Sequence, residues 1–253
     1  MTDDHPDRRG VVDIRELGVE YRKARSREPV IALSETTAHI DAGAFVTLLG
    51  ASGCGKSTLL NAIAGFVLPS HGSIEVDGRP VRGPGPDRAV VFQQYALLPW
   101  LTARANIEFA LKRFALPRAE QRERALAALE AVNLGHAADS LPAELSGGMQ
   151  QRVSMARALA AEPDVLLMDE PFGALDAITR AVMQELILEI WERTSTTILF
   201  VTHDVDEALF LSQRILLMSA QPGRVTEDIS LIGADEPALA ETRRRIVSHL
   251  GGH

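Results

Sequence analysis

Eight consecutive residues place glycines, a lysine and a serine at a spacing suited to holding phosphate. The run Gly50 to Ser57 reads GASGCGKS and fits the pattern G-x-x-x-x-G-K-[ST], directly after the apolar run Phe45 to Leu49. Glycines let the backbone curl so that successive N–H groups and the following helix N-terminus point at negative charge. Read alone, the run is a glycine-rich turn, but a strand before it and a helix after it favour a nucleoside triphosphate site.

Within this loop, Lys56 is expected to reach the β- and γ-phosphates, and the hydroxyl of Ser57 is expected to bind Mg²⁺. The predicted nucleotide contacts of the loop are Gly50, Ala51, Ser52, Gly53, Cys54, Gly55, Lys56, Ser57 and Thr58.

A second element lies far downstream, where an apolar run ends in two carboxylates. Val165 to Met168 has the pattern of a buried strand and is followed by Asp169 and Glu170. In a parallel sheet, these carboxylates lie at the carboxyl edge, beside a phosphate loop that follows another strand. Asp169 is expected to hold Mg²⁺, and Glu170 to act as general base on the attacking water. The simpler interpretation is a strand that ends in a solvated acidic turn.

A third segment, Leu145 to Arg152, reads LSGGMQQR and opens an amphipathic stretch. Ser146 can cap the helix, and the glycines leave backbone N–H groups and the helix dipole for a second phosphate contact. Taken alone, the segment is only a well-capped helix. With the other two motifs, it resembles the signature sequence of ATP-binding-cassette ATPases, and the resemblance covers nearly the whole chain. The contacts predicted here are Ser146, Gly147, Gly148 and Gln150.

The resemblance assigns roles to four further residues. Tyr21 matches an aromatic residue that stacks on adenine, and Gln93 matches a glutamine that senses Mg²⁺ and the attacking water. Asp176 matches a loop that crosses a dimer interface, and His203 matches a switch histidine on the γ-phosphate. Without the resemblance, Tyr21 is an exposed strand residue, Gln93 a polar strand end and His203 a neighbour of a helix cap.

Composition agrees with one cytoplasmic domain. The 253 residues are 46% hydrophobic, enough for one substantial core, and no apolar run of about 18 residues exists to span a membrane. The acidic start, Met1 to His5, has no signal-peptide pattern. A net charge of −8 argues against nucleic acid as a partner. Cys54 is the single cysteine, which excludes an internal disulfide, and its place beside Lys56 predicts a reactive thiolate.

The order of apolar runs and turn signals predicts an α/β fold: a P-loop NTPase core with a RecA-like mixed sheet flanked by helices, an antiparallel β-lobe and an inserted helical lobe. One cassette fills residues 1–253, with no internal repeat. Its core is expected at about 10–100 and 162–225, its helical lobe at about 101–161 and a short tail at 226–253. Expected core elements are strands at 45–49, 164–169, 197–201 and 215–218, and helices at 56–66, 179–193 and 205–212.

The resemblance implies partners as well as cofactors. Two cassettes of this family pack head to tail around two molecules of Mg·ATP, so Ser146, Gly147 and Gly148 are expected to act on the nucleotide of a second copy. The segments Gly83 to Arg88 and Leu97 to Trp100 are similar to importers of nitrate, sulfonates and taurine, most of all those of taurine. Such importers work at the cytoplasmic face of the inner membrane with a permease and a separate solute-binding protein.

Three alternatives remain open from the sequence. Nitrate importers share the run Tyr95 to Thr102 about as well as taurine importers do. A soluble cassette acting on DNA or ribosomes is disfavoured because the chain lacks a second cassette and a basic surface. An exporter cassette is disfavoured by the runs Phe172 to Asp176 and Leu98 to Trp100.

Overall fold

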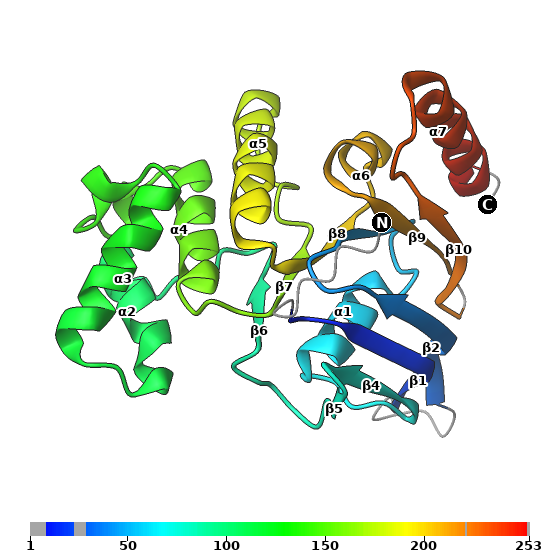
Figure 1. The fold of residues 1–253 in the computed structure, drawn as a ribbon, viewed down its shortest axis with the longest axis horizontal. Helices are drawn as coiled ribbons and strands as arrows, with labels where there is room; N and C mark the ends of the chain where they lie inside the picture. Colours follow the sequence, from blue (N-terminus) through cyan, green and yellow to red (C-terminus); the bar gives the residue numbers. More distant parts are fainter. Residues whose placement is uncertain (1–8, 23–28, 221, 252–253) are drawn as a thin grey trace. The chain divides into compact units, whose positions relative to one another are not determined.

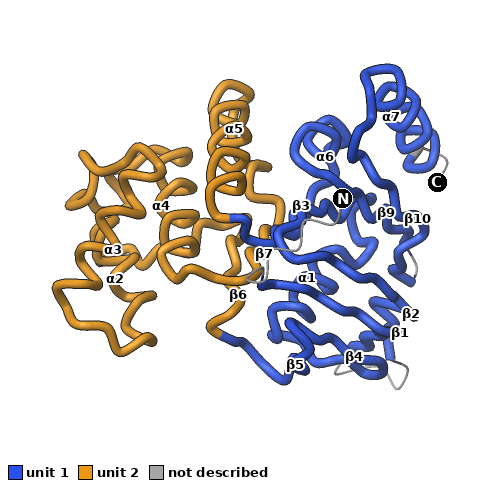
Figure 2. The backbone as a smooth tube through the Cα atoms, viewed as in Figure 1, with its two compact units in different colours: residues 1–85, 195–253 blue, residues 86–194 orange. Residues whose placement is uncertain are grey.

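The computed structural model describes residues 9–22, 29–220 and 222–251. The chain forms two compact units, one made of residues 1–85 and 195–253 and the other of residues 86–194 (Figure 2). The first unit therefore contains both ends of the chain, and the second is a continuous insertion. The predicted division into a core and a helical lobe at 101–161 stays a prediction.

An antiparallel sheet in the first unit confirms the predicted β-lobe (Figure 1). Its strand order is β2-β1-β4-β5, and the strands are β1 Val12–Arg22, β2 Pro29–Ile40, β4 His71–Val76 and β5 Arg79–Pro80. Alternate residues of the inner strands, such as Val12, Ile14 and Ile74, are buried, as expected for a sheet with one face on the core. The turn signal Ser26-Arg27-Glu28-Pro29 predicts a break between β1 and β2, and all of it except Pro29 lies outside the described residues.

The parallel strands of the first unit carry the phosphate loop. β3 (Phe45–Gly50) pairs in parallel with β8 (Thr197–Thr202) and β9 (Arg214–Ser219). All residues of β3 and β8 are buried, which explains their mostly apolar sequences. Helix α1 (Lys56–Ala64) ends before the predicted Phe66. Gly65 stops the helix in the left-handed region, where a Cβ would lie 2.2 Å from the carbonyl oxygen of Gly83.

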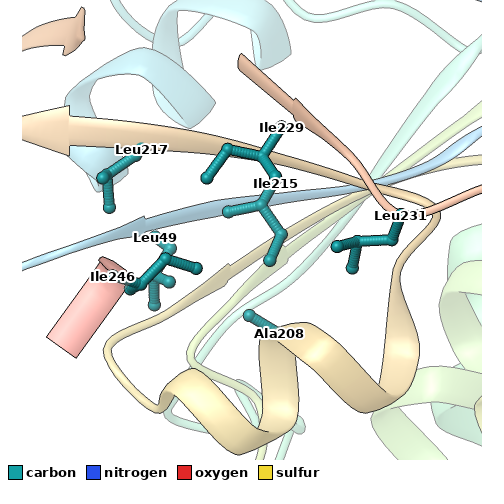
Figure 3. Packing of buried hydrophobic residues seen from close by; sticks show 7 residues of the cluster. All are labelled: Leu49, Ala208, Ile215, Leu217, Ile229, Leu231 and Ile246. Atoms are coloured by element: carbon teal, nitrogen blue, oxygen red, sulfur yellow. The ribbon is translucent and has the colours of Figure 1, made fainter. Parts of the chain in front are cut away.

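The predicted tail contributes to the core. β10 (Arg224–Ser230) pairs antiparallel with β9, and α7 (Glu236–Gly251) contacts α6 (Val205–Leu211). Figure 3 shows the buried cluster that these elements share; its members are Leu49, Ala208, Ile215, Leu217, Ile229, Leu231 and Ile246. Because Leu49 directly precedes the phosphate loop, this packing fixes the strand that carries the loop.

The second unit combines two parallel strands with helices. β6 (Arg88–Val91) pairs with β7 (Val165–Asp169), which confirms the predicted strand before the two carboxylates. The predicted helical stretch is also confirmed, and α5 matches the long helix expected at 179–193. The helices are α2 Ala103–Leu111, α3 Arg118–Ala131, α4 Gly147–Leu159 and α5 Ala177–Thr194. Short 3₁₀ turns are η1 Lys112–Phe114, η2 Gly135–Ala137 and η3 Pro142–Glu144.

Candidate functional site

The phosphate loop curls around the ammonium group of Lys56. This side chain is buried, and its Nζ donates to the carbonyl oxygens of Gly50 at 2.7 Å and Ala51 at 3.1 Å. Gly53 and Gly55 have φ values of 80° and 92°, in the left-handed region where a side chain is costly. The loop therefore has the shape and the central positive charge that an anion site requires.

The N-terminus of α1 completes the positive end of the loop. Gly55 is its N-cap residue, no side chain caps the helix, and its first turn contains no acidic residue. The amide groups of such a first turn lack intrahelical acceptors and carry the positive end of the helix dipole. Phosphate oxygens are suitable acceptors for them. Ser57 and Thr58 begin this helix, at the positions predicted for metal and phosphate contacts.

The environment of Cys54 contradicts the predicted reactive thiolate. Its side chain is fully buried, and a Cβ on Gly50 would lie only 2.6 Å from its Sγ. Burial raises the pKa of the thiol and outweighs the opposing effect of the Lys56 ammonium, whose Nζ is 4.0 Å from Sγ. The thiol is therefore protonated and inaccessible, because burial destabilises the thiolate more than the positive charge of Lys56 stabilises it.

Two other predicted residues of the first unit lie at the surface. Tyr21 is 42% exposed near the end of β1, where it pairs with Val30 of β2. His203 is exposed in the short connection between β8 and α6. The helix cap beside it is Asp204, whose carboxylate accepts from the amides of Asp206 and Glu207 at 2.8 and 3.2 Å. The capping role thus belongs to Asp204, and the switch role of His203 stays a prediction.

In the second unit, Gln93 and Glu170 lie close to a single glycine. Val91 of β6 pairs with Met168 of β7. Gln93 lies two residues after Val91, and Glu170 lies two residues after Met168. A Cβ on Gly173 would lie 3.6 Å from Nε2 of Gln93 and 4.0 Å from Oε2 of Glu170. Glu170 itself has a φ of 43°, an unfavourable value for a residue with a side chain. Such strain is common where the fold holds a side chain for a specific task.

The signature segment begins a helix as predicted. Ser146 is the N-cap of α4, and its Oγ accepts from the amide of Met149 at 3.3 Å. Gln150 does not extend outward, because its Nε2 donates to the carbonyl oxygens of Pro142 at 3.0 Å and Leu145 at 3.1 Å. Gln150 therefore supports the turn before Ser146, while Ser146 and Gly147 are exposed.

The signature segment also touches the start of α5. A Cβ on Gly148 would lie 2.6 Å from Cγ2 of Thr179. The hydroxyl of Thr179 donates to Asp176 at 2.7 Å, and Asp176 also accepts from the amides of Ile178 and Thr179. These bonds, first the one from the Thr179 hydroxyl, lower the pKa of Asp176. Thr179, which sequence reasoning missed, thereby joins Gly148 to Asp176.

The predicted metal ligands are a hydroxyl on Ser57, an amide on Gln93 and a carboxylate on Asp169. Across residues 9–22, 29–220 and 222–251, no group of three or more His, Cys, Asp or Glu side chains could hold a metal ion. A set of few oxygen donors fits Mg²⁺, which keeps several waters and relies on the phosphates of its substrate. No described helix is long and apolar enough to cross a membrane.

Comparison with known proteins gives consistent matches. Residues 33–173 match the family model of the ABC transporter. A taurine import ATP-binding protein of Rhizobium johnstonii is 53% identical over 82% of this chain and 79% of its own length. A nitrate import ATP-binding protein of Synechococcus elongatus is 48% identical over 85% of this chain and 79% of its own length.

A solved structure supports the same match. It is an ATP-binding cassette captured as a dimer in a post-hydrolysis state with ADP and Pi, and it is 34% identical to this chain. The match covers 87% of this chain and 98% of that one, with a TM-score of 0.77.

Proposed function

Because the chain belongs to the ABC transporter family and is an ATPase of that family, we propose that it energises the import of a small anion. The observation that carries the proposal is a lysine-centred phosphate loop in the first unit. The second unit by itself holds Gln93 and Glu170 around Gly173. The first binds a triphosphate, and the second supplies an amide and a carboxylate suited to orienting and deprotonating water.

Each residue then has a defined task on one nucleotide. Lys56 binds the β- and γ-phosphates, and Ser57 and Asp169 hold Mg²⁺. When bound there, the ion would supply positive charge that offsets the charge of the phosphates. Glu170 acts as general base on the attacking water. Gln93 and His203 respond to the γ-phosphate, and Tyr21 stacks on the adenine.

A second copy of the chain completes the site. Ser146, Gly147 and Gly148, together with the loop around Asp176, contact the nucleotide held by the partner copy. The support is the exposure of Ser146 and Gly147 at a helix N-terminus and the dimeric state of the related cassette with ADP and Pi. ATP-driven closure of this dimer is the step that a membrane permease would use.

The imported substrate is proposed to be taurine or another sulfonate, with nitrate as the alternative. Relatives that import taurine and nitrate have similar identities, 53% and 48%. The cassette would act at the cytoplasmic face of the inner membrane with a permease and a solute-binding protein, and without nucleic acid. Neither unit needs to touch the imported solute for this role, so the solute is decided by those partners.

The test of the ATPase is phosphate release by purified protein with Mg·ATP over a range of protein concentrations. A rate per subunit that rises with concentration supports a dimeric ATPase, and no release above a Lys56→Ala control contradicts it. The substrate is tested on the solute-binding protein encoded nearest to this chain. Taurine binding without nitrate binding supports the first choice, and the reverse result supports the alternative.

A further inference from the structure

A short segment connects Gln93 to helix α2, and we call residues 93–101 the strap. Two polar side chains from different helices hold it. Asn106 of α2 is buried, accepts from the amide of Leu98 at 2.8 Å, and donates to the carbonyl oxygens of Leu98 and Leu101 at 3.2 and 3.0 Å. These bonds fix the end of the strap that lies next to α2.

Arg157 of α4 holds the other end. Its guanidinium donates to the carbonyl oxygen of Ala96 at 2.6 Å and to that of Tyr95 at 3.2 Å. In the described part of the chain, Arg157 has no carboxylate partner, and burial lowers the pKa of its guanidinium. Burying a guanidinium costs free energy unless its N–H groups form hydrogen bonds. The two bonds to carbonyl oxygens therefore define the position of Arg157.

The backbone at this point adopts a conformation that needs support. Ala96 has a φ of 48°, in the left-handed region that a residue with a Cβ rarely occupies. The carbonyl of this strained residue receives the shorter of the two bonds from Arg157. The arginine thus stabilises the bend that directs the strap away from Gln93.

The strap also touches the signature segment directly. A Cβ on Gly147 would lie 3.0 Å from the hydroxyl oxygen of Tyr95. Tyr95 therefore contacts the backbone of the signature through its side chain, while its carbonyl is held by the helix that Ser146 caps. The strap and α4 are therefore joined at two points, the carbonyls that Arg157 binds and the hydroxyl of Tyr95 beside Gly147.

We propose that Arg157 is a positioning residue that locks the strap to the signature helix, so that Gln93 and Ser146 move as one piece. Tyr95 is its companion at the second contact. Neither Arg157 nor Tyr95 is assigned a contact with the nucleotide of its own subunit. The proposal rests on the proposed ATPase function. Arg157 acts on the step in which the signature of one copy meets the nucleotide of the other.

The experiment compares Arg157→Met, Arg157→Lys, Tyr95→Phe and the double variant Arg157→Met, Tyr95→Phe with the wild type. Arg124→Met is the matched control, because Arg124 lies on α3 of the same unit and, among the described residues, pairs only with Glu120 and Glu162. Three quantities are measured: the Kd of Mg·ATP at protein concentrations too low for dimers, kcat, and KM. Thermal melting shows whether each variant is folded.

Arg157→Met is expected to lower kcat by about tenfold to hundredfold, the loss typical of a misplaced reacting partner, while the Kd of Mg·ATP stays within about twofold. Arg157→Lys should recover part of the loss, because an ammonium can still donate to the strap. Tyr95→Phe should lower kcat less, and its effect should not add to that of Arg157→Met, since both side chains hold the same segment against α4. The control should match the wild type.

Three results would overturn the proposal: a wild-type kcat in Arg157→Met, an equal loss of Mg·ATP affinity and kcat, or strictly additive effects of the two substitutions. If Arg157→Met does not fold, Arg157→Lys and Tyr95→Phe decide on the same criteria. A wild type that releases no phosphate would instead refute the proposed ATPase function, so the two failures are distinguishable.

Discussion

The ammonium group of Lys56 lies 2.7 Å from the carbonyl oxygen of Gly50, the residue at which β3 ends and the phosphate loop begins. Lys56 thus forms hydrogen bonds with its own loop without a bound phosphate. Phosphate oxygens carry full negative charge and are stronger acceptors than the carbonyls of Gly50 and Ala51. Nucleotide binding therefore exchanges two neutral acceptors for charged ones.

Lys56→Met is expected to remove this exchange. A hydrogen bond to a charged group contributes about 1.5–3 kcal/mol, so the Kd of Mg·ATP should rise about tenfold to hundredfold. Isothermal titration calorimetry measures it directly. Lys112→Met is the matched control, because Lys112 is exposed on η1 and contacts the Phe109 ring. Equal affinity in Lys56→Met and the control would exclude Lys56 from phosphate binding.

Cys54 is expected to be inert in the folded protein. Its burial and raised pKa leave little thiolate at neutral pH, so a maleimide should label the native chain far more slowly than the urea-unfolded chain. Cys54→Ser should keep ATPase activity because the thiol takes no part in the chemistry. Rapid labelling of the native chain, with protection by ATP, would restore the thiolate that the sequence predicts.

Trp100 offers a surface for a partner. Its side chain is 72% exposed on the strap, so Trp100 is not a core residue. Trp100→Glu should therefore leave the ATPase of the free cassette near the wild-type rate and reduce transport when the permease is present. Phe109→Glu is the control, since Phe109 is also exposed in this unit at 52%. Equal transport by both variants would remove Trp100 from the permease contact.

The contacts of His39 with two aspartates predict that the stability of the fold depends on pH. Its Nδ1 lies 2.8 Å from Asp13 and its Nε2 3.2 Å from Asp41, and the bond to Asp13 is the main cause that raises its pKa. A raised pKa in the folded state stabilises the protein fully below the unfolded value and loses that effect as the pH rises through the folded value. The side chain is half exposed, so about 0.2–1 kcal/mol is expected.

The check is urea unfolding of the wild type and His39→Gln at pH 5.5 and pH 8.5. The wild type should be the more stable of the two at the lower pH, and the difference should shrink at the higher pH. A difference that grows with pH would contradict the assignment of the charged histidine to the two aspartates.

Much of the fold follows from local sequence patterns. The loop from Gly50 to Ser57 and the strand before Asp169 depend on short-range spacing and on apolar runs, and both are found as predicted. Strand and helix ends were predicted less closely, as at Gly65, where termination depends on the contact with Gly83. Among the residues of helix α7 whose burial is described, Ile246 alone is fully buried, so the sequence of the helix carries little apolar pattern.

The contacts that the sequence does not reveal are long-range. Arg157 binds carbonyls that lie 61 and 62 positions earlier in the chain, and no local pattern encodes that bond. Arg157 lies within the short run Met155 to Leu159, whose other members are apolar, and this is the signal that could have indicated a buried polar task. Cys54 was misjudged because its place beside Lys56 indicates a nearby positive charge but does not reveal that the side chain is fully buried.

Glu170 and Ser146 test the central claim, which is a nucleotide site shared by two copies. Glu170→Gln should still bind Mg·ATP but lose general-base catalysis, a loss of about 10²–10⁴-fold in rate. Closed dimers should then accumulate, because the γ-phosphate that joins the copies is not removed. A second substitution, Ser146→Arg, places bulk and positive charge where the partner's nucleotide would dock.

The measurement is size-exclusion chromatography with Mg·ATP on Glu170→Gln and on the double variant Glu170→Gln, Ser146→Arg. Arg124→Met in the Glu170→Gln background is the control for an unrelated surface change in the same unit. The account predicts a dimer for the single variant and for the control, and a monomer for the double variant. A double variant that still dimerises on ATP, or a Glu170→Gln protein that hydrolyses ATP near the wild-type rate, would contradict it.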